Sequence, residues 1–141
     1  MIETTGDIWE YSGKRWIIIT TNGTIKRDGT CVMGRGIAEQ AKDRYPELPK
    51  LLGDYIGKFG NKIMPWWNKS LITFPVKHNW WEDADLKLIE KSCQELAEFL
   101  GPSPGAMVRP GCGNGGLSWS TVKPILEKYF SDNILIVERG V

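Results

Sequence analysis

The sequence has few of the residues that build metal sites and disulfide frameworks. His78 is the one histidine, and three cysteines occur in 141 residues. Cys31, Cys93 and Cys112 are odd in number and share no C-x-x-C spacing, so neither a metal cage nor a set of disulfides is expected. We therefore expect no metal and no cofactor, and this cysteine usage fits the reducing cytoplasm.

Long apolar runs and an excess of charge of either sign are also absent. Lysine and arginine number 18 against 17 acidic residues, which gives a formal net charge of +1. This balance offers no general argument for binding nucleic acid or membranes. Residues 1–15 lack the features of a signal peptide, and no apolar run is long enough to cross a bilayer. We expect a cytoplasmic monomer without membrane association.

The sequence does contain enough apolar residues for one domain, which we expect to span residues 1–141. Hydrophobic residues make up 41% of the chain. Short β-branched or apolar runs predict strands at 15–21, 70–75, 105–110 and 133–138. Apolar residues at helical spacing predict helices at 36–45, 48–59, 84–100 and 118–130.

This alternation of strands and helices predicts an α/β fold. Strands joined by helices form a largely parallel sheet whose two faces are both covered. The pattern also allows an antiparallel strand at the N-terminal edge, near Asp7–Tyr11.

Two glycine-rich segments stand where such sheets bind ligands, at the step from a strand into a helix. CVMGRGIA (31–38) opens the first helix and GCGNGGLSW (111–119) opens the last. Glycine lets main-chain N–H groups turn toward an anion, which the start of the following helix also attracts. Neither segment contains the G-K-[ST] of a P-loop. One such segment alone would be an ordinary turn, but the pair predicts a diphosphate held by main-chain donors.

Segments spread in order over nearly the whole chain resemble the macro domain family. They are GDIWE (6–10), TTN (20–22), CVMGRGIAEQAKDRYP (31–46), FPVKHNWW (74–81) and RPGCGNGGLSWSTVKPIL (109–126). The resemblance is closest to the branch with the DNA ADP-ribosyl glycohydrolase antitoxin DarG and the human terminal ADP-ribose glycohydrolase, and to compact bacterial and phage proteins. It implies a three-layer α/β/α sandwich with a mixed sheet, and ADP-ribose as ligand.

The resemblance also implies roles for single residues. Asp7 would accept from the adenine amino group beside Ile8, and Asn22, next to Thr21, would bind the distal ribose. One side of the diphosphate would be held by Gly34, Gly36, Ile37 and Ala38. The other phosphate and the distal ribose would be enclosed by Gly111, Cys112, Gly113, Asn114, Gly115, Gly116 and Leu117. Without the other motifs, Asp7 would be an ordinary cap or turn residue, and Asn22–Gly23 an ordinary turn pair.

Lys77 follows a predicted strand, at the position that acts on the anomeric carbon of the distal ribose in the resembling glycohydrolases. A neutral amine can capture this carbon as a Schiff base. Apolar neighbours such as Trp80 and Trp81 favour the neutral amine, whereas the diphosphate favours the ammonium. A charged Lys77 would instead assist the leaving group or position the ribose. The neighbouring His78 is a candidate proton shuttle or an orienting residue.

By this resemblance, the human terminal ADP-ribose glycohydrolase has an aspartate at the position of Gly115, and that aspartate helps release a covalent intermediate. The DarG pattern has glycine at this position, as this sequence does. Cys112 is not favoured as a nucleophile, because no histidine accompanies it in its motif. The tryptophan pairs 66–67 and 80–81 are candidates for the rim of the ligand site, although aromatic pairs also serve ordinary packing.

Three functions stay open at this point. The first is a hydrolase that removes ADP-ribose from nucleic acid or protein through Lys77. The second is a reader that binds ADP-ribose without turnover, which Gly115 favours. The third is a phosphatase acting on ADP-ribose 1″-phosphate. A short basic cluster that includes Lys26 and Arg27 is compatible with nucleic acid, and the fold alone does not separate the three.

Overall fold

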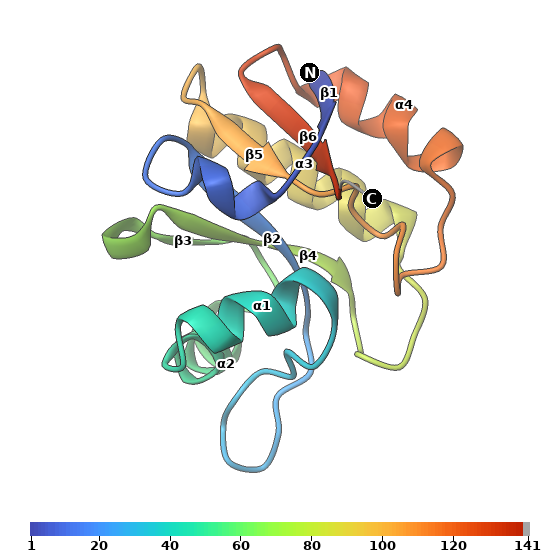
Figure 1. Ribbon diagram of the computed structural model, residues 1–141. Helices are drawn as coiled ribbons and strands as arrows, with labels where there is room; N and C mark the ends of the chain where they lie inside the picture. The colour runs from blue at the N-terminus through green and yellow to red at the C-terminus, as the bar shows by residue number, and fades with distance from the viewer. Residues whose placement is uncertain (140–141) are drawn as a thin grey trace.

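Six strands form one sheet in the order β1-β6-β5-β2-β4-β3 in the computed structural model, which describes residues 1–139 (Figure 1). They are β1 (Ile2–Thr5), β2 (Trp16–Asn22), β3 (Met64–Trp66), β4 (Leu71–Lys77), β5 (Gly105–Met107) and β6 (Ile134–Glu138). Neighbouring strands run parallel, except that β3 pairs antiparallel with β4. The five parallel strands therefore all end at the same edge of the sheet.

Two pairs of helices cover the two faces of this sheet (Figure 1). One face packs against α1 (Gly36–Arg44) and α2 (Leu48–Phe59), and the other against α3 (Leu86–Leu100) and α4 (Trp119–Tyr129). Two short 3-10 helices, η1 (Ile8–Tyr11) and η2 (Trp67–Lys69), complete the described elements. This arrangement confirms the predicted three-layer α/β/α sandwich with a mixed, largely parallel sheet.

Side chains in the first part of β2 alternate between the two cores, which explains the apolar run of residues 16–19. Ile17 and Ile19 lie in the core under α1 and α2, while Ile18 lies in the core under α3 and α4. All three are buried. A central parallel strand buried on both faces reads as a continuous β-branched run.

The predicted antiparallel edge strand near Asp7–Tyr11 is wrong. Gly6 turns the chain at φ +145°, and Asp7 then caps η1 by accepting from Trp9 N at 3.0 Å. A side chain that bonds the main chain two residues ahead favours a helical turn over a strand. The N-terminal edge is β1, which runs parallel to β6. No helix within residues 1–139 is both long and apolar enough to cross a bilayer.

Candidate functional site

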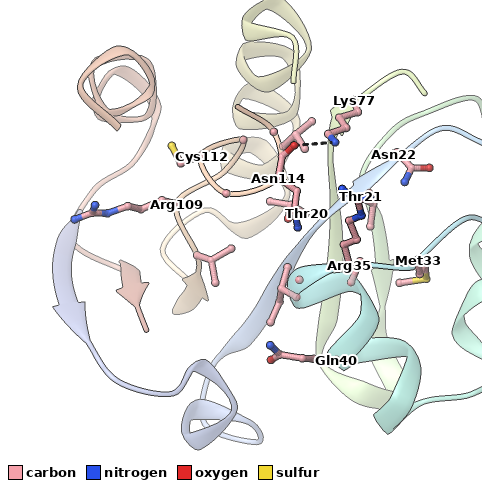
Figure 2. Close-up of a pocket in the computed structure, with 18 of the residues that line it drawn as sticks. Thr20, Thr21, Asn22, Met33, Arg35, Gln40, Lys77, Arg109, Cys112 and Asn114 are labelled. Atoms are coloured by element: carbon pink, nitrogen blue, oxygen red, sulfur yellow. Dashed lines mark hydrogen bonds between the residues drawn. The ribbon is translucent and has the colours of Figure 1, made fainter. Parts of the chain in front are cut away.

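The edge at which the parallel strands end opens into a cavity of about 1470 Å³ (Figure 2). Every parallel strand contributes its carboxyl end or the residues just after it, as is usual for ligand sites of α/β sheets. Of the residues predicted for the site, those that line the cavity are Asp7, Ile8, Thr21, Asn22, Gly34, Gly36, Ile37, Ala38, Lys77, Gly111, Cys112, Gly113, Asn114 and Gly115.

The first glycine segment brings the start of α1 to the cavity. Arg35 is extended (φ −145°) and Gly36, at φ +57°, is the first residue of the helix. A positive φ of this size favours glycine. A Cβ on Gly34 would meet no atom within 4 Å, so the protein's own packing does not require glycine there. The unpaired N–H groups of the first helical turn suit an anion.

The second glycine segment folds back on itself before α4. Leu117 N donates to Gly111 O at 3.0 Å, and a Cβ on Gly115 would overlap that same carbonyl oxygen. Gly111 itself has φ +74° and lies close to side chains of the core. A Cβ on Gly113, in contrast, would meet nothing within 4 Å. The loop's own geometry thus requires Gly111 and Gly115, while Gly113 leaves open space on the cavity wall.

The two glycine segments face each other across the cavity (Figure 2). A Cβ on Gly36 would lie 3.5 Å from Asn114 Nδ2. The start of α1 and the tip of the second segment are therefore close enough to contact one small ligand together.

Lys77 ends β4 and reaches the second glycine segment. Its Nζ donates to the carbonyl oxygens of Asn114 at 3.2 Å and Trp80 at 3.3 Å, and Figure 2 shows the bond to Asn114. Asn61 Nδ2 donates to the Lys77 carbonyl at 3.0 Å, which fixes the strand end. Two carbonyls thus orient the Lys77 nitrogen, and one position on it stays free: a lone pair in the amine or an N–H in the ammonium.

The end of β2 presents one buried hydroxyl without a partner. Thr21 is 4% exposed and lines the cavity, and its Oγ1 makes no hydrogen bond within residues 1–139. Asn22, next along the strand, uses its amide on its own loop: Nδ2 donates to Val32 O and Oδ1 accepts from Thr24 N, each at 3.0 Å. Asn22 therefore braces the loop, and one amide hydrogen remains for a ligand.

The turn after β1 also lines the cavity. Asp7 Oδ1 caps η1, which leaves the second carboxylate oxygen for another donor. Ile8 and Trp9 are buried beside it, and Trp9 Nε1 donates to Gln40 Oε1 at 2.8 Å. The capping role and the adenine-binding role that were weighed for Asp7 are therefore compatible.

His78, Gly116 and Leu117 do not line the cavity. His78 Nε2 lies 2.7 Å from Asp85 Oδ2, and this hydrogen bond is the main cause that lowers the pKa of the Asp85 carboxyl. Asp85 also caps α3, so His78 is directed toward that helix. Burial raises the pKa of the Cys112 thiol, which makes Cys112 a poor nucleophile at neutral pH.

Several cavity residues were not predicted from the sequence. The unpredicted ones include Arg35, Arg109, Arg139 and Glu138, which line the cavity beside the predicted Asp7 and Lys77. Lys26, which was named only as part of a basic cluster, lines it as well. Arg109 bonds Glu138 at 3.0 Å. Among residues 1–139, no three side chains of the metal-ligating types form a cluster. The position of Arg35 between two glycines was the one sequence signal available for this set.

Solved structures share this architecture. The macrodomain of Mycobacterium tuberculosis DarG superposes with a TM-score of 0.78 at 25% identity, covering 99% of this chain and 97% of that one. The macrodomain of Thermus aquaticus DarG gives a TM-score of 0.74 at 20% identity. The chain is a macrodomain. Thermosipho africanus DarTG in complex with ADP-ribose also matches, with a TM-score of 0.78 at 21% identity over 41% of its length.

Two curated proteins with similar sequences carry the name DNA ADP-ribosyl glycohydrolase, one of them as part of a fusion protein. This macrodomain is 34% identical over 114 residues to a DNA ADP-ribosyl glycohydrolase of Mycobacterium tuberculosis, covering 70% of this chain. It is 26% identical over 135 residues to a DNA ADP-ribosyl transferase–DNA ADP-ribosyl glycohydrolase fusion protein of Thermosipho africanus. The chain spans 32% and 35% of the lengths of these two relatives. A scan against protein-family models finds no match.

Proposed function

We propose that this macrodomain binds ADP-ribose and hydrolyses the bond that joins it to a modified nucleic acid. The observation that carries the proposal is the position of Lys77 Nζ, held by the Asn114 carbonyl on a cavity that both glycine segments line. The names of the curated relatives and the ADP-ribose complex of a structural neighbour support the choice of ligand and acceptor. The proposed setting is the cytoplasm, with the protein acting as a monomer without metal or cofactor.

The ligand lies across the carboxyl ends of the strands. Adenine lies at the turn with Asp7 and Ile8, and the diphosphate lies between the start of α1 and the second glycine segment. The distal ribose then reaches Lys77 and the remaining amide hydrogen of Asn22. Opposed anion-binding segments fix the distance between the adenine end and the reacting carbon, so binding also orients the bond that breaks.

The Lys77 amine supplies the covalent step in this proposal. Its lone pair forms a bond to the anomeric carbon while the bond to the acceptor breaks, and the leaving electron pair and a proton go to the acceptor. Opening of the ribose ring gives an imine, which water hydrolyses to free ADP-ribose and the original amine. The two carbonyls hold Nζ at the cavity wall and leave one of its positions free for the ribose.

The test compares three substrates in wild type and Lys77→Met: an ADP-ribosylated oligonucleotide, an ADP-ribosylated glutamate protein and ADP-ribose 1″-phosphate. We expect release from the oligonucleotide to fall by about 100-fold or more in Lys77→Met, since such catalytic groups contribute about 10²–10⁴-fold. Calorimetry should show ADP-ribose binding retained. Lys91→Met, an exposed lysine on α3, is the control. Tight binding with no release from any substrate would identify a reader instead.

A further inference from the structure

Two side chains contact each other at the base of the second glycine segment. Trp119 is the last residue of this segment, and Arg109 lies two residues before its first. The Arg109 guanidinium carbon lies 5.1 Å from the centroid of the Trp119 ring. A cation over an indole is attracted by the negative face of the ring. The contact therefore closes residues 109–119, which join β5 to α4, into a loop.

The carboxylate of Glu3 on β1 joins this contact. Glu3 Oε1 accepts from Trp119 Nε1 at 2.8 Å, and Glu3 Oε2 lies 2.6 Å from Lys123 Nζ. Arg109 Nη2 lies 3.7 Å from Glu3 Oε1. The hydrogen bonds from Lys123 and Trp119 lower the pKa of the Glu3 carboxyl, which keeps it ionised at neutral pH. We call Glu3, Arg109, Trp119 and Lys123 the Glu3 cluster.

The charge of Arg109 is engaged by the protein itself. Arg109 Nη2 also lies 3.0 Å from Glu138 Oε2, at the end of β6. Figure 2 shows the Arg109 side chain extending toward β1, away from Lys77 and Asn114. Arg109 lines the cavity, but its guanidinium is therefore directed at carboxylates of the protein and not at a ligand.

The loop closed by the Glu3 cluster needs a fixed backbone. It is rich in glycine, the residue that loses most conformational entropy when it becomes ordered. The loop lines the cavity, and its Asn114 carbonyl accepts from Lys77 Nζ. A loop that became ordered only on binding would weaken the affinity. A single exposed ion pair would hold it weakly, but here Glu3 is shared by donors from both ends of the loop.

Glu3 also connects this loop to the turn that carries Asp7. Gly6 turns the chain directly after β1, at φ +145°, and leads into Asp7, which lines the cavity. A fixed position of β1 relative to the loop therefore sets the distance between Asp7 and the main-chain donors of the second glycine segment. In the proposed binding mode, these two groups contact the adenine and the diphosphate of one ligand.

We propose that Glu3 is a positioning residue for ADP-ribose, which acts through Arg109 and Trp119 to hold the second glycine segment ready for the diphosphate. Glu3, Trp119 and Lys123 do not line the cavity, so the effect is exerted through the loop and not by contact with the ligand. The inference rests on the proposed function, because it takes ADP-ribose as the ligand. It assigns a role in binding to a strand that carries none of the glycine motifs.

Glu3→Gln tests the proposal by the direction of its effect. A negative charge near an anion site repels the anion, so its removal would by itself strengthen ADP-ribose binding. The proposal predicts the opposite. The affinity measured by calorimetry should fall by about 3- to 10-fold, because the loop then becomes ordered at the expense of binding. Hydrogen exchange of the amides in residues 111–117 should become faster at the same time.

Trp119→Phe provides a second variant with a different chemical change. Phenylalanine keeps an aromatic ring beside Arg109 but has no Nε1 to donate to Glu3. This variant should also bind ADP-ribose more weakly. Because both residues act through the same cluster, the double variant should lose less affinity than the product of the two single losses.

Glu90→Gln is the matched control. Glu90 on α3 accepts from Tyr129 OH at 2.8 Å and lies 3.9 Å from Lys128 Nζ, so it also joins an aromatic donor and a lysine of α4, but outside the cavity. Its affinity should stay within about twofold of wild type, and thermal unfolding should change little in either glutamine variant, since exposed ion pairs contribute little to stability.

Unchanged or tighter ADP-ribose binding in Glu3→Gln would overturn the inference and leave the proposed function intact. Equal losses of affinity in Glu3→Gln and Glu90→Gln would overturn it as well, because the effect would then be one of general stability. A wild type that shows no binding of ADP-ribose by calorimetry would instead overturn the proposed function itself.

Discussion

Lys77 Nζ lies 3.2 Å from the carbonyl oxygen of Asn114, which ties the end of β4 to the tip of the second glycine segment. The same tip lies close to Gly36 at the start of α1. One loop therefore positions the candidate nucleophile and forms part of the anion site. Displacement of this loop would disturb binding and chemistry together.

Lys77→Arg separates the two chemical roles proposed for this lysine. Arginine keeps the positive charge but stays protonated and forms no imine with the ribose. If the amine bonds to the anomeric carbon, Lys77→Arg should lose release of ADP-ribose as fully as Lys77→Met, by about 100-fold or more. The measurement is the initial rate on an ADP-ribosylated oligonucleotide. Substantial activity in Lys77→Arg would show that charge alone suffices.

Gly34→Ala tests whether open space on the cavity wall belongs to the ligand. Because a Cβ there meets no protein atom within 4 Å, we expect unchanged or slightly higher thermal stability. ADP-ribose affinity should fall by about tenfold, equivalent to about 1.4 kcal/mol. Calorimetry and thermal unfolding provide the two readouts.

Gly57→Ala is the control for this change. Gly57 lies in α2, outside the cavity, and its Cβ would also meet nothing within 4 Å. It should stabilise the protein by about 0.5–1 kcal/mol, the gain of alanine over glycine inside a helix, and leave affinity unchanged. Equal affinities in Gly34→Ala and Gly57→Ala would mean that the ligand does not use the first glycine segment.

Thr21→Val tests the buried hydroxyl that has no partner. Removing an unsatisfied hydroxyl costs the free protein little, so stability should be unchanged or higher. ADP-ribose affinity should fall by about 2- to 10-fold if the ligand bonds this oxygen, since one hydrogen bond contributes about 0.5–1.5 kcal/mol.

Thr73→Val gives the opposite pattern and serves as its control. Thr73 is buried and its Oγ1 accepts from Met64 N at 3.0 Å. The substitution leaves that N–H unpaired and should destabilise the protein by about 1–3 kcal/mol, with little effect on affinity. A Thr21→Val variant that is destabilised like Thr73→Val would show an internal role for the hydroxyl.

Gly115→Asp places a carboxylate where the human terminal ADP-ribose glycohydrolase is expected to have one. We expect it to lower both affinity and stability, because any Cβ at this position overlaps the Gly111 carbonyl. Gly115→Ala should show losses of similar size. The measurements are ADP-ribose affinity by calorimetry and thermal unfolding, each on both variants. Faster release in Gly115→Asp would show that the loop adapts and that the carboxylate was the limiting feature.

The sequence predicted the parts of the fold and site that depend on local pattern. The continuous apolar run of β2 and the helical spacing in α3 each reflect one buried environment, so their type could be read directly. The two glycine segments and Lys77 were also identified locally, and the structure brings them to one cavity. β1 and β3, with four and three residues, are too short to show any period.

Features that depend on the folded conformation of loops and turns could not be predicted in this way. The overlap that fixes Gly115 involves Gly111 after the loop has folded, and the unpaired state of the Thr21 hydroxyl depends on its neighbours in the folded protein. The Asn22 amide bonds Val32 on its own loop, which no turn motif specifies. The edge strand expected near Asp7 is replaced by η1, because the capping bond of Asp7 outweighs a weak strand pattern.

A crystal structure with ADP-ribose tests the central claim most directly. The account predicts that main-chain nitrogens of both glycine segments lie within hydrogen-bonding distance of the diphosphate, and that the anomeric carbon of the distal ribose lies against Lys77 Nζ. A nucleotide bound outside this cavity, or one that contacts only one segment with its ribose turned away from Lys77, would contradict it.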